Sequence, residues 1–136
     1  MAIISIDYGT RFIGVAVSDA DEKLALRHSV LEQRKAAAGE RIAQLAAAEQ
    51  VRLVLVGVPR GLSGNETAQT RQCRAFVQRL RRALGSDIPV EEVDELFTTK
   101  EAERRIRSEG GHLSQAHAEA ARIMLEDYLK KRMTND

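Results

Sequence analysis

The chain opens with two apolar runs on either side of a glycine turn, and an aspartate ends the first run. Ala2–Asp7 is apolar enough to form a buried strand, Gly9 allows a tight turn, and Ile13–Ser18 predicts a second strand. A carboxylate at the end of a central strand, beside a turn that a ligand can approach closely, is typical of sites that hold a metal ion against a phosphate. The alternative is that Asp7 is an ordinary turn residue of a hairpin.

Composition narrows the class of protein. With 136 residues, of which 43% are hydrophobic, the chain can bury one sizeable core, which predicts a single domain over residues 1–136. The formal net charge is only +1, so any affinity for nucleic acid must come from a local basic surface. A single cysteine cannot form a disulfide within the chain, and no apolar run is long enough to cross a bilayer. We therefore expect a cytoplasmic protein without membrane contact.

The rest of the chain predicts helices that alternate with strands. Further strands are expected at 24–31, 51–58 and 88–93, and helices at 35–50, from Asn65 to about 85, from Thr98 to about 108 and from Ser114 to about 132. Val51–Val58 is an almost continuous aliphatic run, as in a strand covered on both faces. Pro89 cannot donate to a strand ladder, which places the fifth strand at an edge.

This order of elements predicts an α/β fold with a mixed five-stranded sheet flanked by helices. Right-handed crossovers give the strand order 3-2-1-4-5, with the second strand antiparallel to its neighbours. Open sheets bind ligands at the carboxyl ends of their parallel strands. Asp7, the loop that begins at Pro59, and the acidic pair Asp94–Glu95 should meet at that edge.

Short motifs spread over almost the whole chain resemble the YqgF/RuvX family. The motifs are Asp7-Tyr8-Gly9-Thr10 with Ile13-Gly14-Val15-Ala16-Val17-Ser18-Asp19, Val56-Gly57-Val58-Pro59 with Gly64, Asp94-Glu95-Leu96-Phe97-Thr98-Thr99, Ala120-Ala121 and Leu125-Glu126-Asp127-Tyr128-Leu129. The resemblance implies a ribonuclease H-like fold and a metal-dependent nuclease that acts on structured nucleic acid. The substrate would be Holliday junction DNA or the 5′ end of pre-16S rRNA. A junction resolvase would need two sites related by symmetry, and thus a homodimer.

The resemblance also implies the catalytic residues, which are Asp7, Asp94, Glu95 and His117. Among these, Asp7, Glu95 and His117 would hold Mg²⁺ or Mn²⁺, with Glu95 favoured over Asp94 as the metal ligand. His117 stands where the family has a third acid, and an imidazole nitrogen tilts the preference towards Mn²⁺. In the first turn of a helix, the dipole favours its neutral, ligating form. The alternative is that His117 is partly exposed and binds no ligand.

Contacts with nucleic acid are expected at Gly9, Thr10, Arg11, Arg60 and Thr98. Arg11 and Arg60 lie in the loops of the expected site and are assigned to phosphates. The arginines of the helix that follows residue 65 are instead interpreted as a solvated face.

Several motif positions depart from the family pattern. The family usually has arginine at Phe12 and Leu96 and a Leu-Asn pair at Arg60-Gly61. These departures leave a second hypothesis open, a catalytically weak or silent member that binds RNA or a protein partner in ribosome maturation. A third hypothesis is a nucleotide-phosphate-binding domain, because an Asp-x-Gly-Thr turn also resembles the first phosphate loop of the actin, sugar kinase and heat-shock ATPase group. That group needs two such domains to close on ATP.

Overall fold

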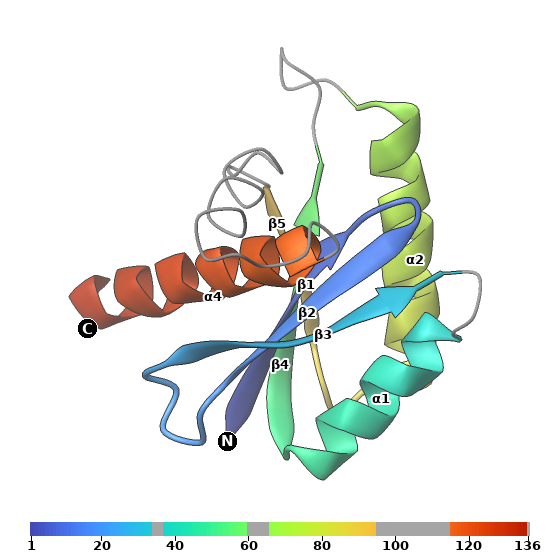
Figure 1. Ribbon diagram of the computed structural model, residues 1–136. Helices are drawn as coiled ribbons and strands as arrows, with labels where there is room; N and C mark the ends of the chain where they lie inside the picture. Colours follow the sequence, from blue (N-terminus) through green and yellow to red (C-terminus); the bar gives the residue numbers. More distant parts are fainter. Residues whose placement is uncertain (34–36, 60–65, 95–114, 136) are drawn as a thin grey trace.

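The computed structural model describes residues 1–33, 37–59, 66–94 and 115–135. In chain order, the elements within these ranges are β1 (Ala2–Tyr8), β2 (Phe12–Ser18), β3 (Ala25–Glu32), α1 (Ala38–Ala48), β4 (Val51–Val58), α2 (Ala68–Leu84), β5 (Val90–Asp94) and α4 (Ala116–Asn135) (Figure 1). The helix expected from Thr98 to about 108 lies outside the described residues, as do Asn65 and Ser114. None of the helices in the described ranges is long and apolar enough to cross a membrane.

The strands form one five-stranded sheet in the order β3-β2-β1-β4-β5, which confirms the predicted topology. β2 runs antiparallel to both β1 and β3, whereas β1, β4 and β5 are parallel. β5 begins directly after Pro89 and forms an edge of the sheet, as the missing amide of proline requires.

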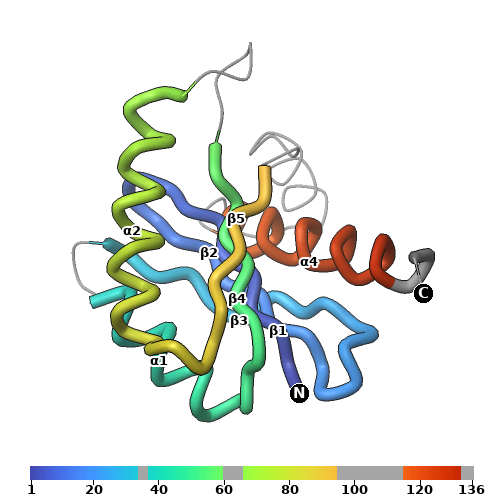
Figure 2. Tube along the Cα trace, turned by 180° about the vertical axis from the view of Figure 1, so that it is seen from behind, coloured from blue at the N-terminus to red at the C-terminus, as the bar shows by residue number. Residues whose placement is uncertain are grey.

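The sheet separates two helical layers. α1 and α2 cover one face and α4 crosses the other, as Figures 1 and 2 show from opposite sides. Side chains of β1 alternate between the two faces: Ile4 and Ile6 join the core under α1 and α2, whereas Ile3 joins the core under α4. The same alternation puts Asp7 on the α4 face.

α2 begins at Ala68, three residues later than the predicted start at Asn65. The N-cap is Thr67, whose hydroxyl accepts a hydrogen bond from the Thr70 amide at 3.2 Å while the Thr70 hydroxyl accepts one from the Thr67 amide at 3.0 Å. Sequence reasoning missed this capping box because threonine occupies the place that glutamate or glutamine usually takes. The Thr70 hydroxyl also donates to the Pro59 carbonyl at 2.6 Å, which fixes the start of α2 against the end of β4.

Glu22 links three elements at the opposite end of the sheet. Its carboxylate accepts hydrogen bonds from Arg52 of β4, with Nε at 2.8 Å, and from Arg132 near the end of α4. The hydrogen bonds from Arg52, supported by Arg132, lower the pKa of Glu22 to about 2, against the opposing effect of burial. The two cations therefore hold this carboxylate charged far into the acid range.

Replacing Glu22 by glutamine should make the fold less stable at neutral pH and less sensitive to acid. The folded pKa lies below the ordinary value of 4.5, so the stabilisation is present above that pH and is lost as the pH falls towards 2. We expect Glu22→Gln to reduce the free energy of unfolding at neutral pH by about 1–2 kcal/mol, after allowance for solvent screening. Urea denaturation at neutral and acidic pH measures this. Asp21→Asn, at the exposed neighbouring residue, is the control, and equal losses in both variants would contradict the assignment.

Candidate active site

Asp7 lies between two glycines on the α4 face of the sheet. The strand register pairs it with Gly14 of β2 on one side and with Gly57 of β4 on the other. A Cβ atom added at Gly14 would lie 2.0 Å from the carbonyl oxygen of His117, and one added at Gly57 would lie 2.9 Å from the sulfur of Met124. The absence of side chains on both neighbours of Asp7 therefore lets α4 pack directly on the sheet, with its first turn beside the carboxylate.

His117 is the second residue of α4 and reaches Asp7 from this first turn. Its Nδ1 atom lies 2.7 Å from Oδ2 of Asp7, a hydrogen-bond distance between residues 110 positions apart in the sequence. The side chain of Asp7 is 5% exposed and that of His117 is 21% exposed. The structure thus brings together a buried carboxylate and an imidazole that opens towards solvent, two of the residues expected at the site.

The turn after β1 packs closely against the imidazole. A Cβ atom at Gly9 would lie 2.7 Å from Cε1 of His117, so only glycine leaves room for the ring. The Gly9 carbonyl accepts a hydrogen bond of 2.6 Å from the side-chain amide of Gln33, which holds the turn in place. Thr10 and Arg11 are exposed at the tip of the turn, where a phosphate could meet them.

Phe12 also belongs to this site, although the sequence suggested only that it departs from the family pattern. Its ring centroid lies 6.4 Å from that of His117, and the Arg11 guanidinium lies 5.0 Å from the centroid of Phe12. Phe12 is two residues before Gly14 on β2 and shares its face of the sheet, which is a pattern that could have placed it near Asp7.

Two sources of charge lie near Asp7 and His117: the amino-terminal end of α4 and the Glu119 carboxylate. The amino-terminal end of α4, where the helix dipole is positive, lies beside the Asp7 carboxylate. Glu119, two residues beyond His117, is 2% exposed and binds Arg122 instead, with Oε1 and Nε 2.5 Å apart. This hydrogen bond to Glu119, with a second to Glu126, raises the pKa of Arg122. The Glu119 carboxylate is therefore ion-paired with Arg122 on another side of the helix, as its spacing from His117 predicts.

The remaining expected residues do not join the pair within the described ranges. Asp94 ends β5 opposite Val58 and is exposed. Val93 packs in the core under α4, so strand alternation places Asp94 on the other face of the sheet, away from Asp7. Glu95, Arg60 and Thr98 lie outside the described residues. Among the residues that are described, no cluster of three or more His, Cys, Asp or Glu side chains could hold a metal ion.

The described part of the site therefore offers one oxygen ligand and one nitrogen ligand. Carboxylate oxygen suits Mg²⁺ and Mn²⁺, and imidazole nitrogen suits transition metals, so the pair fits a divalent ion of this kind. Asp7 and His117 are held rigidly, because one lies in a central strand and the other in a helix that rests on two glycines. Ligands held in this way lose little freedom when an ion binds.

Comparison with known proteins shows the family to which the chain belongs. The model of the RuvX family, described as Holliday junction resolvase, matches residues 1–131. A relative from Maridesulfovibrio salexigens, named "Putative pre-16S rRNA nuclease", is 32% identical over 136 residues, which cover 96% of this chain and 99% of the relative. A relative of the same name from Anaeromyxobacter sp. (strain K) is 34% identical over 137 residues, which cover 97% of this chain and 98% of the relative.

Among solved structures, RuvC from Thermus thermophilus in complex with a Holliday junction substrate superposes with a TM-score of 0.59 at 16% sequence identity. The match covers 98% of this chain and 96% of RuvC, and at this identity it shows the shared fold. Together with the strand order and the family match, it establishes a ribonuclease H-like fold. The chain belongs to the RuvX (YqgF) family of nucleases.

Proposed function

We propose that the protein is a divalent-metal-dependent nuclease that hydrolyses phosphodiester bonds in structured nucleic acid. The observation that carries this proposal is the Asp7–His117 pair, buried at the carboxyl end of β1 beside an exposed Thr10–Arg11 turn. The names of the family model and of the relatives point to two substrates, a Holliday junction and the precursor of 16S rRNA. Both are branched or folded polyanions.

Asp7, His117 and Glu95 would hold Mg²⁺ or Mn²⁺. When bound, such an ion stabilises the charge that builds on the phosphoryl oxygens and lowers the pKa of a bound water. Asp7 would supply the negative ligand from the end of a central strand. Strand alternation disfavours Asp94 as the metal ligand, because it places Asp94 on the face of the sheet opposite Asp7.

The other residues of the site position the substrate. The Gln33 side chain holds the carbonyl of Gly9, and this fixes a turn at which backbone can approach a phosphate closely. Thr10 and Arg11 project from this turn, and Arg60 and Thr98 are the proposed contacts from the neighbouring loops. Arg11 and Arg60 would bind non-bridging phosphate oxygens, which positions the strand without reading its sequence.

A second candidate is a catalytically silent member that binds RNA or a protein partner in ribosome maturation. Two features favour it: His117 stands where the family resemblance implies a third acid, and the residues that the structure describes supply only two ligands. Two ligands hold a divalent ion weakly unless the substrate phosphate or a further acid completes the coordination.

A cleavage assay with two substrates separates these candidates. A synthetic four-way DNA junction and a structured RNA with a 5′ leader are incubated with the protein in EDTA, Mg²⁺ or Mn²⁺, and Asp7→Asn is the inactive control. The proposal expects metal-dependent cleavage of at least one substrate, which also identifies the substrate class. Tight binding of either substrate without cleavage in any metal would instead establish the silent member.

Arg11→Ala should weaken binding to nucleic acid of any sequence and reduce its dependence on salt. Loss of one phosphate contact lowers the slope of log K against log salt by about 0.9 for duplex DNA. Fluorescence anisotropy in EDTA, over a series of KCl concentrations, measures both effects without cleavage. The control is Lys23→Ala, which also removes one positive charge, at an exposed lysine after β2. An Arg11→Ala slope equal to that of Lys23→Ala would remove Arg11 from the phosphate contacts, and the same test applies to Arg60→Ala.

A further inference from the structure

α2 carries a concentration of positive charge that the proposed site does not use. Its 17 residues contain five arginines and no acid. Two of the five are engaged by the fold: Arg74 pairs with Glu92 at 3.3 Å and also with Glu66, and Arg81 donates to the Val90 carbonyl at 3.0 Å. Arg71, Arg79 and Arg82 are exposed and make no ion pair with any residue that the structure describes.

These three arginines share the outward side of the helix. The inward side is formed by Cys73, Phe76, Val77 and Leu80, all of which are buried in the core. At about 100° per residue, Arg71, Arg79 and Arg82 fall within one arc of about 80° on the opposite side. They extend over about 16 Å along the helix, at 1.5 Å per residue. We call Arg71, Arg79 and Arg82 the α2 arginine face.

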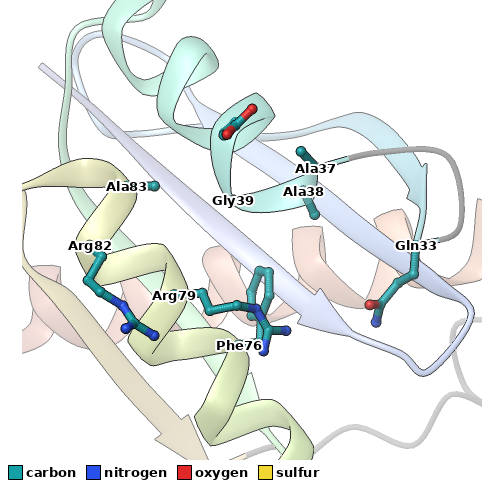
Figure 3. Close-up of a pocket in the computed structure, with 9 residues that line it drawn as sticks. Gln33, Ala37, Ala38, Gly39, Phe76, Arg79, Arg82 and Ala83 are labelled. Carbon is teal, nitrogen blue, oxygen red and sulfur yellow. The ribbon is translucent and has the colours of Figure 1, made fainter.

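A cavity of about 560 Å³ adjoins this face, between α1 and α2 (Figure 3). Arg79 and Arg82 line one wall of the cavity, the start of α1 lines another, and Gln33 and Phe76 lie at its side. Glu40 is the one acid among the lining residues, so the lining keeps a net positive charge. An anion in this cavity would meet two guanidinium groups.

The cavity is connected to the turn of the proposed site. Gln33 lines the cavity and donates to the Gly9 carbonyl, and the Phe76 ring lies 5.2 Å from that of Tyr8, the residue after Asp7. Arg11 is exposed on the same turn, with its guanidinium 5.0 Å from the centroid of the Phe12 ring. A polyanion that crosses the site can therefore continue over the turn and onto the α2 arginine face.

We propose that the α2 arginine face binds the sugar-phosphate backbone of a second segment of the nucleic acid, separate from the segment at the Asp7–His117 pair. This inference rests on the proposed function, because it takes the same molecule as the ligand. Guanidinium groups bind phosphates in bidentate fashion, and these three need break no ion pair with a described residue to do so. The 16 Å span equals the rise of roughly five base pairs, which suits one arm of a branched or folded substrate. A local basic surface also explains how a chain of net charge +1 could hold a polyanion.

The test uses the triple variant Arg71→Gln/Arg79→Gln/Arg82→Gln in the full-length protein. Glutamine has a helix propensity similar to that of arginine and a polar side chain, and all three residues are exposed, so the fold should persist. The matched control is Lys23→Gln/Lys130→Gln/Lys131→Gln, which removes the same charge from exposed residues at the hairpin after β2 and near the end of α4. Affinity for a short-armed and a long-armed four-way junction, and for a structured RNA, is measured by anisotropy in EDTA over a range of KCl concentrations.

The α2 triple should bind the long-armed junction or the RNA about 10- to 100-fold more weakly than wild type, with a salt slope lower by about 2 to 3. Lengthening the arms should strengthen binding by the wild type and the lysine control but not by the α2 triple. Equal affinities and slopes for the two triple variants would overturn the proposal. Because no cleavage is measured, failure here is separate from failure of the nuclease proposal: Asp7→Asn can abolish cleavage while the α2 triple binds normally, or the reverse.

Discussion

Asp7→Asn is expected to abolish cleavage of nucleic acid, by a factor of at least about 1000, and to leave the fold intact. The amide has the size of the carboxylate, and its oxygen can still accept a hydrogen bond from Nδ1 of His117 at the observed 2.7 Å. What disappears is the one negative charge that the described part of the site offers to a cation. A loss of this size corresponds to about 4 kcal/mol of transition-state stabilisation, within the range that metal catalysis supplies.

The measurement compares initial rates of cleavage in saturating Mn²⁺ and thermal melting in EDTA. Ser5→Ala is the matched control. Ser5 lies two residues before Asp7 on β1 and faces the same side of the sheet, and its buried hydroxyl has no hydrogen-bond partner within the described structure. Ser5→Ala should cleave at the wild-type rate. If Asp7→Asn retains a substantial fraction of the wild-type activity in a clean preparation, the catalytic centre lies elsewhere on the protein.

The sheet could be predicted from the sequence because its rules act locally. The apolar run of β4, the handedness of crossovers and the position of Pro89 each restrict strand order without knowledge of long-range contacts. The ends of the helices were harder to predict from the sequence. Thr67 and Thr70 cap α2 reciprocally, and this depends on the position of the Pro59 carbonyl as much as on the two threonines.

The site could be predicted only in part from the sequence, for a similar reason. The end of β1 could be predicted to present Asp7, but the two glycines beside it are neighbours only through the registers of β2 and β4. A single strand does not encode register. The contact of Phe12 with His117 depends on that register and on the close approach of α4 over Gly14. The role of Gln33 likewise depends on β3 returning alongside the turn at Gly9.

His117→Asp is expected to move the metal preference of cleavage from Mn²⁺ towards Mg²⁺, with the ratio of the Mg²⁺ rate to the Mn²⁺ rate rising about 10-fold or more. The substitution replaces a nitrogen ligand with a hard oxygen ligand and adds a negative charge beside Asp7. Without a cation, two carboxylates at this distance repel each other. The variant should therefore melt at a lower temperature than wild type in EDTA and regain stability when Mg²⁺ is added.

Two readouts keep this test independent of the cleavage proposal, because the melting temperature responds to metal binding even if no substrate is cut. His28→Asp is the control: His28 is exposed on β3, and its aspartate variant adds the same charge away from Asp7. If the rate ratio and the effect of Mg²⁺ on melting are the same for both variants, His117 is not a ligand. The imidazole would then orient the Asp7 carboxylate through its hydrogen bond, and the proposed metal ligands would be Asp7 and Glu95.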